Sequence, residues 1–317
     1  MTDTKDISSA ARPSGRRRSD RIVGASSAIK QSVDRATRAA RSNSSVLVTG
    51  PAGSGRVHMA RSIHAWSTRA GVALSVFSAS ATPQDQQQSE LFGVASTAAP
   101  LATGGRDGAL ERAADGTLLL EHVDRLTLAA RSELVQAIEQ QSFKRVGDTA
   151  PVPLRARIIA TGGTGAEQGL GDRFEVVNLS GLAERREDIL PLAVHFLAEH
   201  AASAGHEPVG FTSDARRWLL EEPWSGNIRE LDERVRQAVR LAGDGAISAE
   251  ALMLAAEGEE VPSFKQAKRA FETRYVEGLL RRCNGNISRA ARLAKKDRKD
   301  FYDVIRRTGV DPGHFRP

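Results

Sequence analysis

The sequence predicts an α/β fold built on a parallel sheet, followed by smaller helical parts. Apolar runs recur at residues 45–49, 117–123 and 156–161, and segments with helical periodicity separate them. Buried strands that alternate with helices are typical of a parallel sheet covered on both faces. From about residue 184 the strand pattern stops and only helical patterns follow. An all-α region is therefore expected after the sheet.

The first elements surround a glycine-rich stretch. A helix over 27–40, "SAIKQSVDRATRAA", precedes the strand "SVLVT" of 45–49, and a helix over 56–70 follows the stretch. Another helix is expected over 128–141, between the second and third apolar runs. Three more helices are expected over 186–205, 212–222 and 226–243, from their hydrophobic periodicity and from the residues that begin and end them.

Composition divides the chain into four parts. Residues 1–21 are rich in Ser, Ala, Arg and Asp without periodicity, which is typical of a disordered arm. The α/β core is expected over 22–183, a helical subdomain over 184–256 and a short helical domain over 257–317. A linker near 255–263, "AAEGEEVPS", precedes the last domain.

Charge and cysteine content narrow the class of protein. Residues 264–317 hold 15 Lys/Arg against 6 Asp/Glu, whereas the other 263 residues hold 30 against 33. So basic a tail indicates a polyanion partner, most simply nucleic acid. A single cysteine, Cys283, excludes an internal disulfide and fits a reducing cytoplasm. No apolar stretch is long enough for a membrane span, and the amino terminus lacks the apolar region of a signal peptide.

The stretch of residues 50–57, "GPAGSGRV", has the glycine spacing of a phosphate-binding loop between a strand and a helix. In the full motif a lysine contacts the phosphates and a serine or threonine hydroxyl holds Mg²⁺. Arg56 stands at the lysine position and Val57 at the hydroxyl position. Arg56 keeps the charge, but its planar guanidinium is bulkier and places its donors differently. The candidate nucleotide-binding residues of this loop are Gly50, Gly53, Ser54, Gly55, Arg56 and Val57.

A second diagnostic strand, "DGTLLLEHVDRL", should end in the catalytic acids. The position expected to hold Asp, for the metal, is Glu121, and the position expected to hold Glu, to activate water, is His122. His122 is either a base or a partly buried histidine without a chemical role. With Arg56 also changed, no intact catalytic group remains, so we name no catalytic residue and no metal ligand.

Over almost its whole length the chain resembles the bacterial enhancer-binding proteins, the AAA+ activators of sigma-54 RNA polymerase. The matching stretches are "SELFG" (89–93), "GALERAADGTLLLEHVDRL" (108–126), "LAERREDILPLAVHFL" (182–197), "WSGNIRELDERVRQAV" (224–239) and the tail. The resemblance implies a P-loop-type parallel-sheet core, a helical lid and a small Fis-type helix-turn-helix domain. It also implies ATP as cofactor, with Mg²⁺ only where ATP is bound.

The resemblance also shows which family features have changed. The sigma-contacting loop should fall at Thr97–Ala102, yet these residues are "TAAPLA" and lack the family's Phe-Thr pair. The polar residue of the family's first sensor should follow "RIIA", where Thr161 leads into two glycines. The segment that would carry the arginine fingers, "GAEQGLGDRFEVV" (165–177), is shortened, and Arg173 is the one candidate in it. Arg229 in "GNIRE" persists as the second-sensor arginine and completes the candidate nucleotide site.

The tail predicts a helix over 263–282 and a helix-turn-helix after it. Ser263 and Gln266 have capping-box spacing, and an apolar stripe of Phe264, Ala267, Phe271, Tyr275 and Leu279 suggests a helix pair across a dimer. In the second helix of the motif, Asp297 lies near the cap. The base-reading candidates are Arg298, Lys299, Asp300, Tyr302 and Asp303. The phosphate-contacting candidates are Arg289, Lys295, Lys296, Arg306 and Arg307.

The sequence therefore favours a DNA-binding transcription regulator whose degenerate, hydrolysis-deficient AAA+ domain is an oligomerisation or regulatory scaffold. We expect double-stranded DNA as partner, a dimer through the tail, a higher oligomer through the AAA+ domain and mixing with other enhancer-binding proteins. Contact with sigma-54 is not favoured, and no membrane is involved. Two alternatives stay open: an active ATPase that remodels sigma-54 polymerase, and a structural partner that binds neither ATP nor DNA.

Overall fold

The computed structural model describes residues 22–96, 105–207, 210–255 and 264–315. As far as it is described, the chain forms two compact units, Met1–Gly205 with Arg216–Arg236, and His206–Ala215 with Gln237–Pro317. The predicted arm of 1–21 and the segment Thr97–Ala102 lie outside the described residues, as does most of the linker. Predictions for these segments stay predictions.

The first unit, called the sheet domain, contains a five-stranded parallel sheet in the order β2-β5-β8-β1-β9. In the register of the central strands Val48 is paired with Thr161 and Leu120 with Ala160, so the carboxyl ends of β1, β5 and β8 lie at the same end of the sheet. This confirms the predicted α/β class. The sheet strands are β1 Val46–Thr49, β2 Leu74–Ser78, β5 Thr117–Glu121, β8 Arg157–Gly162 and β9 Glu175–Asn178. Two small antiparallel pairs join β3 Gly93–Val94 to β4 Arg106–Asp107 and β6 Ser142–Lys144 to β7 Pro151–Pro153.

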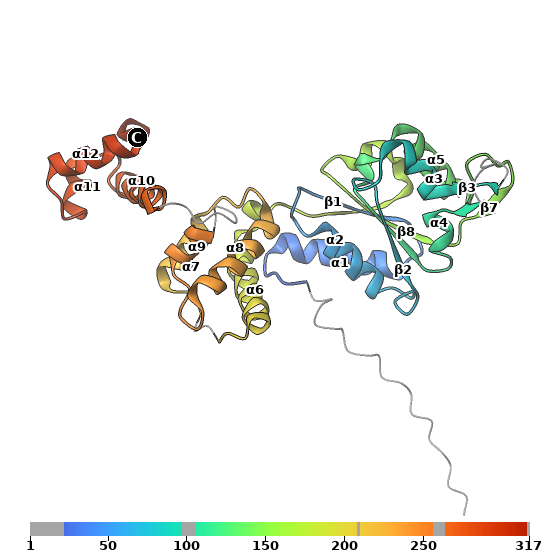
Figure 1. Cartoon of the computed structure of the whole chain (residues 1–317), viewed down its shortest axis with the longest axis horizontal. Coiled ribbons are helices and arrows are strands. Elements are labelled where there is room, and N and C mark those ends of the chain that lie inside the picture. Colours follow the sequence, from blue (N-terminus) through green and yellow to red (C-terminus); the bar gives the residue numbers. More distant parts are fainter. Residues whose placement is uncertain (1–21, 97–104, 208–209, 256–263, 316–317) are drawn as a thin grey trace, which may run out of the picture. The chain divides into compact units, whose positions relative to one another are not determined.

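Helices cover both faces of the sheet (Figure 1). On one face Val46 and Val48 of β1 pack against α1 and α2, and on the other face Leu47 packs with side chains from α3, α4 and α5. Both clusters are apolar throughout, so the sheet is the buried centre of the unit. The helices are α1 Ser27–Arg41, α2 Arg56–Ala65, α3 Gln87–Phe92, α4 Ala109–Arg112 and α5 Leu128–Gln140.

The helix after the glycine-rich loop is shorter than expected. The pattern predicted a helix over 56–70, but α2 ends at Ala65. Ser67 explains the end, because its hydroxyl donates to the carbonyl of His64 at 2.7 Å and accepts the N–H of Arg69 at 3.1 Å. Local side-chain bonds of this kind compete with the helical ladder.

Helices dominate after β9, as the sequence predicted. They are α6 Ile189–Ala204, α7 Ser213–Glu221, α8 Asn227–Ala242 and α9 Ala249–Leu254. Within the first unit the guanidinium of Arg234 lies 5.2 Å from the ring centres of both Trp218 and Trp224. The indole N–H of buried Trp224 donates to the carbonyl of Leu219 at 2.8 Å. This aromatic cluster packs the middle of α8 against α7 and the turn between them.

The carboxyl-terminal residues form three helices, α10 Phe264–Arg282, α11 Ile287–Leu293 and α12 Arg298–Thr308, which belong to the second compact unit and are together called the three-helix unit. Their own core contains Val276, Leu280, Phe301 and Ile305. Of the apolar stripe predicted on α10, Leu279 packs against this core, whereas Tyr275 is 44% exposed. Among the described side chains of α10, those fully buried are Val276 and Leu280, each one position after a predicted stripe residue. Ser263 and the side chains of residues 264–271 lie outside the described parts.

Candidate functional site

The loop after β1 has the backbone of a phosphate-binding loop. Gly50, Gly53 and Gly55 all have positive φ, at 149°, 75° and 98°. A Cβ at Gly53 would lie 2.1 Å from the carbonyl oxygen of Gly226, and one at Gly50 would lie 2.4 Å from that of Leu179. Only glycine fits these two positions, since other residues would meet both strain and backbone atoms. The glycines thus allow the loop to turn directly into α2.

Three contacts hold the loop from the far part of the same unit. The side-chain amide of Asn227 donates to the carbonyl of Ala52 at 2.8 Å, and its oxygen accepts the N–H of Leu182 at 2.7 Å. Buried Arg185 donates to the carbonyl of Ser54 at 2.8 Å, and the N–H of Arg229 donates to the carbonyl of Gly53 at 3.2 Å. These bonds hold the loop carbonyls of Ala52, Gly53 and Ser54.

The amino end of α2 has the features that an anion needs. Gly55 caps the helix without any side-chain bond, so the first N–H groups of α2 are not satisfied by a capping side chain. Ser54 is 1% exposed and its Oγ has no hydrogen-bond partner among the described residues. A buried hydroxyl without a partner costs free energy that a bound acceptor would recover. The loop therefore fits the phosphate groups of a nucleotide.

Arg56, the first residue of α2, is partly buried beside a carboxylate. A Cβ at Gly163 would lie 3.7 Å from Oδ2 of Asp124 and 4.0 Å from Nη1 of Arg56, so both side chains border the same point. Burial lowers the pKa of the Arg56 guanidinium, the charge of Asp124 raises it and the charge of Arg229 lowers it. The guanidinium remains a cation at neutral pH, and it lies near one anion and a second cation.

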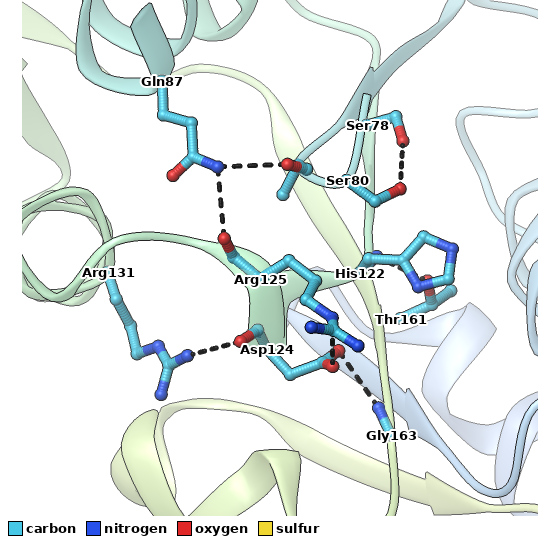
Figure 2. Close-up of polar contacts among 10 residues, drawn as sticks. Ser78, Ser80, Gln87, His122, Asp124, Arg125, Arg131, Thr161 and Gly163 are labelled. Carbon is cyan, nitrogen blue, oxygen red and sulfur yellow. Dashed lines mark hydrogen bonds and ion pairs between the residues drawn. The ribbon is translucent and has the colours of Figure 1, made fainter. Parts of the chain in front are cut away.

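The end of β5 and the turn after it carry the two positions where the motif has its acids, and Figure 2 shows His122 and Asp124 of this turn. Glu121 ends the strand, and His122 follows with φ of 58° and donates its N–H to Oγ1 of Thr161 at 3.2 Å. Two residues later, Oδ1 of Asp124 accepts the N–H of Gly163 at 3.1 Å. The carboxylate that a backbone N–H holds at the carboxyl end of β5 is therefore that of Asp124, and not a side chain at the motif positions 121 and 122.

The side chains at the loop do not match the ligand set of a nucleotide-bound Mg²⁺. Val57 occupies the hydroxyl position, and its side chain packs against the apolar cluster under α1 and α2. Among the described residues no group of three or more His, Cys, Asp or Glu side chains could hold a metal ion.

The two sensor candidates and the arginine-finger candidate lie in different settings. Thr161 is 1% exposed on β8 and accepts the N–H of His122, so its hydroxyl supports the turn after β5. Arg173 lies just before β9 and forms an ion pair with Glu139 at 2.8 Å. Arg229 lies at the start of α8 next to Gly53, where a Cβ on that glycine would be 3.3 Å from its own Cβ. Of the three, Arg229 is the one that the structure brings to the phosphate loop.

In the three-helix unit the predicted DNA-contacting side chains are exposed on α11, α12 and the turn between them. Asp297 occupies the N-cap position of α12, as expected, and makes no side-chain capping bond. Arg307 differs from the other candidates because its guanidinium makes two hydrogen bonds to Glu272 of α10, at 2.8 and 3.1 Å. The exposed candidates are Arg289, Lys295, Lys296, Arg298, Lys299, Asp300, Tyr302, Asp303, Arg306 and Arg307.

Sequence reasoning missed three residues of the site: Asp124, Arg185 and Asn227. Each lies within a stretch that resembles the family, but none stands at a position of the phosphate-loop or acid motifs. The sequence signal that could have drawn attention to Arg185 is "RRED" (185–188), in which two arginines are followed by two acids. Its burial lowers its pKa, while Asp188 and Glu184 act in the opposite direction.

Comparison with protein-family models gives two matches. The model described as the sigma-54 interaction domain matches residues 22–173. The model described as the AAA+ ATPase lid domain matches residues 183–269.

Similar proteins include transcriptional regulators and a solved structure. The transcriptional regulatory protein GlrR of Escherichia coli is 31% identical over 310 residues, which cover 93% of this chain and 69% of that protein. The transcriptional activator RocR of Bacillus subtilis is 32% identical over 301 residues, covering 86% of this chain and 65% of its own. The crystal structure of NtrX from Brucella abortus in complex with ATP matches with a TM-score of 0.67 and 29% identity, over 92% of this chain and 70% of that one. A second NtrX structure, in complex with ADP, matches with a TM-score of 0.65 and 28% identity, over 92% and 69% of the two chains.

Proposed function

This chain belongs to the sigma-54-dependent transcriptional regulators with an AAA+ domain, and on that premise we propose that it is a DNA-binding regulator that binds nucleotide without efficient hydrolysis. Its AAA+ domain is then an oligomerisation or regulatory scaffold rather than a motor. The observation that carries this proposal is the contrast between the backbone of the phosphate loop and the side chains around it.

Binding is supported by the loop itself. The positive-φ glycines, the helix start and the unpartnered Oγ of Ser54 offer donors to phosphate groups. Relatives described in complex with ATP and ADP share this fold at 28–29% identity. We infer that a nucleotide occupies the same loop here.

Slow hydrolysis is supported by the substituted side chains. Phosphoryl transfer depends almost entirely on positioning and charge stabilisation. Here the lysine, metal-ligand and base positions hold Arg56, Glu121 and His122, and the N–H of His122 is bonded to Thr161. Without the usual base and metal ligands, the water and the terminal phosphate lack their positioning groups.

DNA binding is supported by the carboxyl-terminal helices. α11 and α12 are joined by a short turn and share a core, and the outer face of α12 is exposed and charged. A helix-turn-helix of the Fis type places such a second helix in the major groove. A dimer through this unit, a higher oligomer through the AAA+ domain and mixed assemblies with related activators complete the proposal. The proposed site of action is the bacterial cytoplasm. Among the helices of the described residues, none has both the length and the apolar composition to span a membrane.

The competing function is an active ATPase that remodels sigma-54 polymerase. The observation that favours it is the persistence of cations at Arg56 and Arg229 beside the loop. ATP binding and steady-state hydrolysis, measured on the full-length protein with Mg²⁺ beside an active relative, separate the two. Binding without turnover is the expected result, and turnover comparable to the relative would establish the motor instead.

A second experiment tests the DNA-binding tail. Removal of residues 264–317 should abolish sequence-specific DNA binding while the sheet domain still unfolds cooperatively. Specific binding by the shortened protein would refute the assignment of the tail, and thermal unfolding of the same sample controls for its integrity.

A further inference from the structure

The carboxylate of Asp124 lies near Arg56 at the phosphate loop. It borders the same point beside Gly163 as Nη1 of Arg56, and a backbone bond from the N–H of Gly163 fixes its direction. Two further arginines contact Asp124: Nε of Arg125 lies 3.8 Å from its Oδ2, and Arg131 donates to its backbone carbonyl at 3.1 Å (Figure 2). The side chain of Asp124 is 34% exposed, so it is open to a ligand.

Arg56 stands where the motif places the lysine that contacts the β- and γ-phosphates. A diphosphate on the loop would find donors in Ser54, the start of α2 and Arg56. A third phosphate would extend past Arg56 toward the carboxylate of Asp124. In phosphate loops whose lysine is followed by a serine or threonine, the hydroxyl holds Mg²⁺, which offsets the repulsion between the third phosphate and nearby carboxylates. Val57 stands at this position and supplies no ligand for the ion.

We propose that this loop selects a nucleoside diphosphate over a triphosphate without a metal ion, with Arg56 supplying the cation and Asp124 disfavouring the terminal phosphate. The inference rests on the proposed binding of nucleotide and adds its chemical form. Two negative groups a few ångströms apart repel strongly in a partly buried site, because screening by water is reduced.

The test is nucleotide binding by the full-length protein, measured by calorimetry with ADP and with ATP, each in Mg²⁺ and in EDTA. The wild type should bind ADP about tenfold more tightly than ATP. EDTA should change the ADP affinity less than about twofold, since no metal contributes to binding. Asp124→Asn keeps the oxygen that accepts the N–H of Gly163 and removes the charge, so it should bring the ATP affinity to within about twofold of the ADP affinity.

The matched control is Asp115→Asn. Asp115 is exposed at the other end of β5, where it pairs with Arg155 at 3.6 Å, so its neutralisation should leave the ratio of the two affinities unchanged. Thermal unfolding of both variants reports whether they are folded.

The outcomes separate this inference from the proposed function. Tighter binding of ATP with Mg²⁺, or an affinity ratio that Asp124→Asn leaves unchanged, would overturn the selection of diphosphate while nucleotide binding stands. Failure of the folded wild type to bind either nucleotide would overturn both. A ratio that shifts equally in Asp115→Asn would show a general charge effect and would remove Asp124 from its assigned role.

Discussion

The phosphate loop and the three-helix unit present their candidate binding groups in opposite ways. At the loop the groups are mainly backbone atoms, and glycine packing and bonds from Asn227 and Arg185 fix them. On α12 the groups are exposed side chains, while the core that supports them is made of other residues such as Phe301 and Ile305. In the loop, shape and binding therefore depend on the same residues, whereas in the tail they depend on different ones.

This difference explains how the two regions tolerate substitution. Arg56 and Val57 depart from the motif in a loop whose three glycines keep positive φ, whereas a side chain at Gly50 or Gly53 would meet backbone atoms. On the outer face of α12 a substitution changes contact with a ligand and leaves the core intact.

The largest expected effect is on the tail. Phe301 is 1% exposed in a core of few residues, so Phe301→Ala should cost roughly 4 kcal/mol and unfold the three-helix unit. DNA binding should disappear while the sheet domain keeps its own unfolding transition, as followed by calorimetry. A parallel loss of the sheet transition would show that the two regions do not fold independently.

The next effect concerns the glycines. Gly53→Ala should destabilise the sheet domain by about 3 kcal/mol, because its Cβ would meet the carbonyl of Gly226 at positive φ. Urea unfolding gives the value. Gly71→Ala is the control, since its Cβ would meet nothing within 4 Å. Equal effects of the two substitutions would contradict the close approach at Gly53.

A third prediction separates the roles of the tail cations. Arg298→Ala should cost about 2 kcal/mol of DNA binding and relax sequence preference, whereas Lys296→Ala should weaken all sequences alike and lower the salt dependence. Arg307→Ala should weaken binding less than Arg306→Ala, because Arg307 is paired with Glu272. Titrations with specific and unrelated DNA at several salt concentrations measure the affinity, the sequence preference and the salt dependence of each variant. Loss of preference in Lys296→Ala would reverse the assignment.

The smallest effect is a pH dependence in the sheet domain. Burial lowers the pKa of His64, as does the charge of Arg157, while a bond to the backbone of Val72 raises it. The unfolded chain therefore binds the proton more readily. His64 contributes stability that is present above about pH 6.5 and lost as the pH falls toward the folded pKa. His64→Gln should flatten this part of the stability curve from pH 7 to 5, and the same change at exposed His58 should not.

Much of the fold could be predicted from the sequence because buried central strands are continuous apolar runs. β1, β5 and β8 were located that way, whereas α1 and α5 were located by their helical periodicity. β2 and β9 were missed, since each lies at an edge of the sheet and carries polar side chains among its apolar ones. Edge strands give a weaker pattern because only part of their surface is buried.

The candidate site was predicted in part. The glycines and Arg229 follow a motif, and the structure brings Arg229 to the loop. Asp124 and Asn227 depend on tertiary geometry, since each approaches the loop from another segment of the chain. No local pattern indicates that Asn227 would bond to Ala52, 175 positions earlier.

That long separation has a consequence for how the loop is made during synthesis. The bond from Asn227 to Ala52 and the bond from Arg229 to Gly53 require α8, which the ribosome produces long after β1 and α2. Domains fold as their segments emerge, and contacts of high sequence separation form late. A nascent chain that ends before residue 227 thus carries the glycines of the loop without the bonds that shape it. Nucleotide should be captured only once the start of α8 has left the exit tunnel.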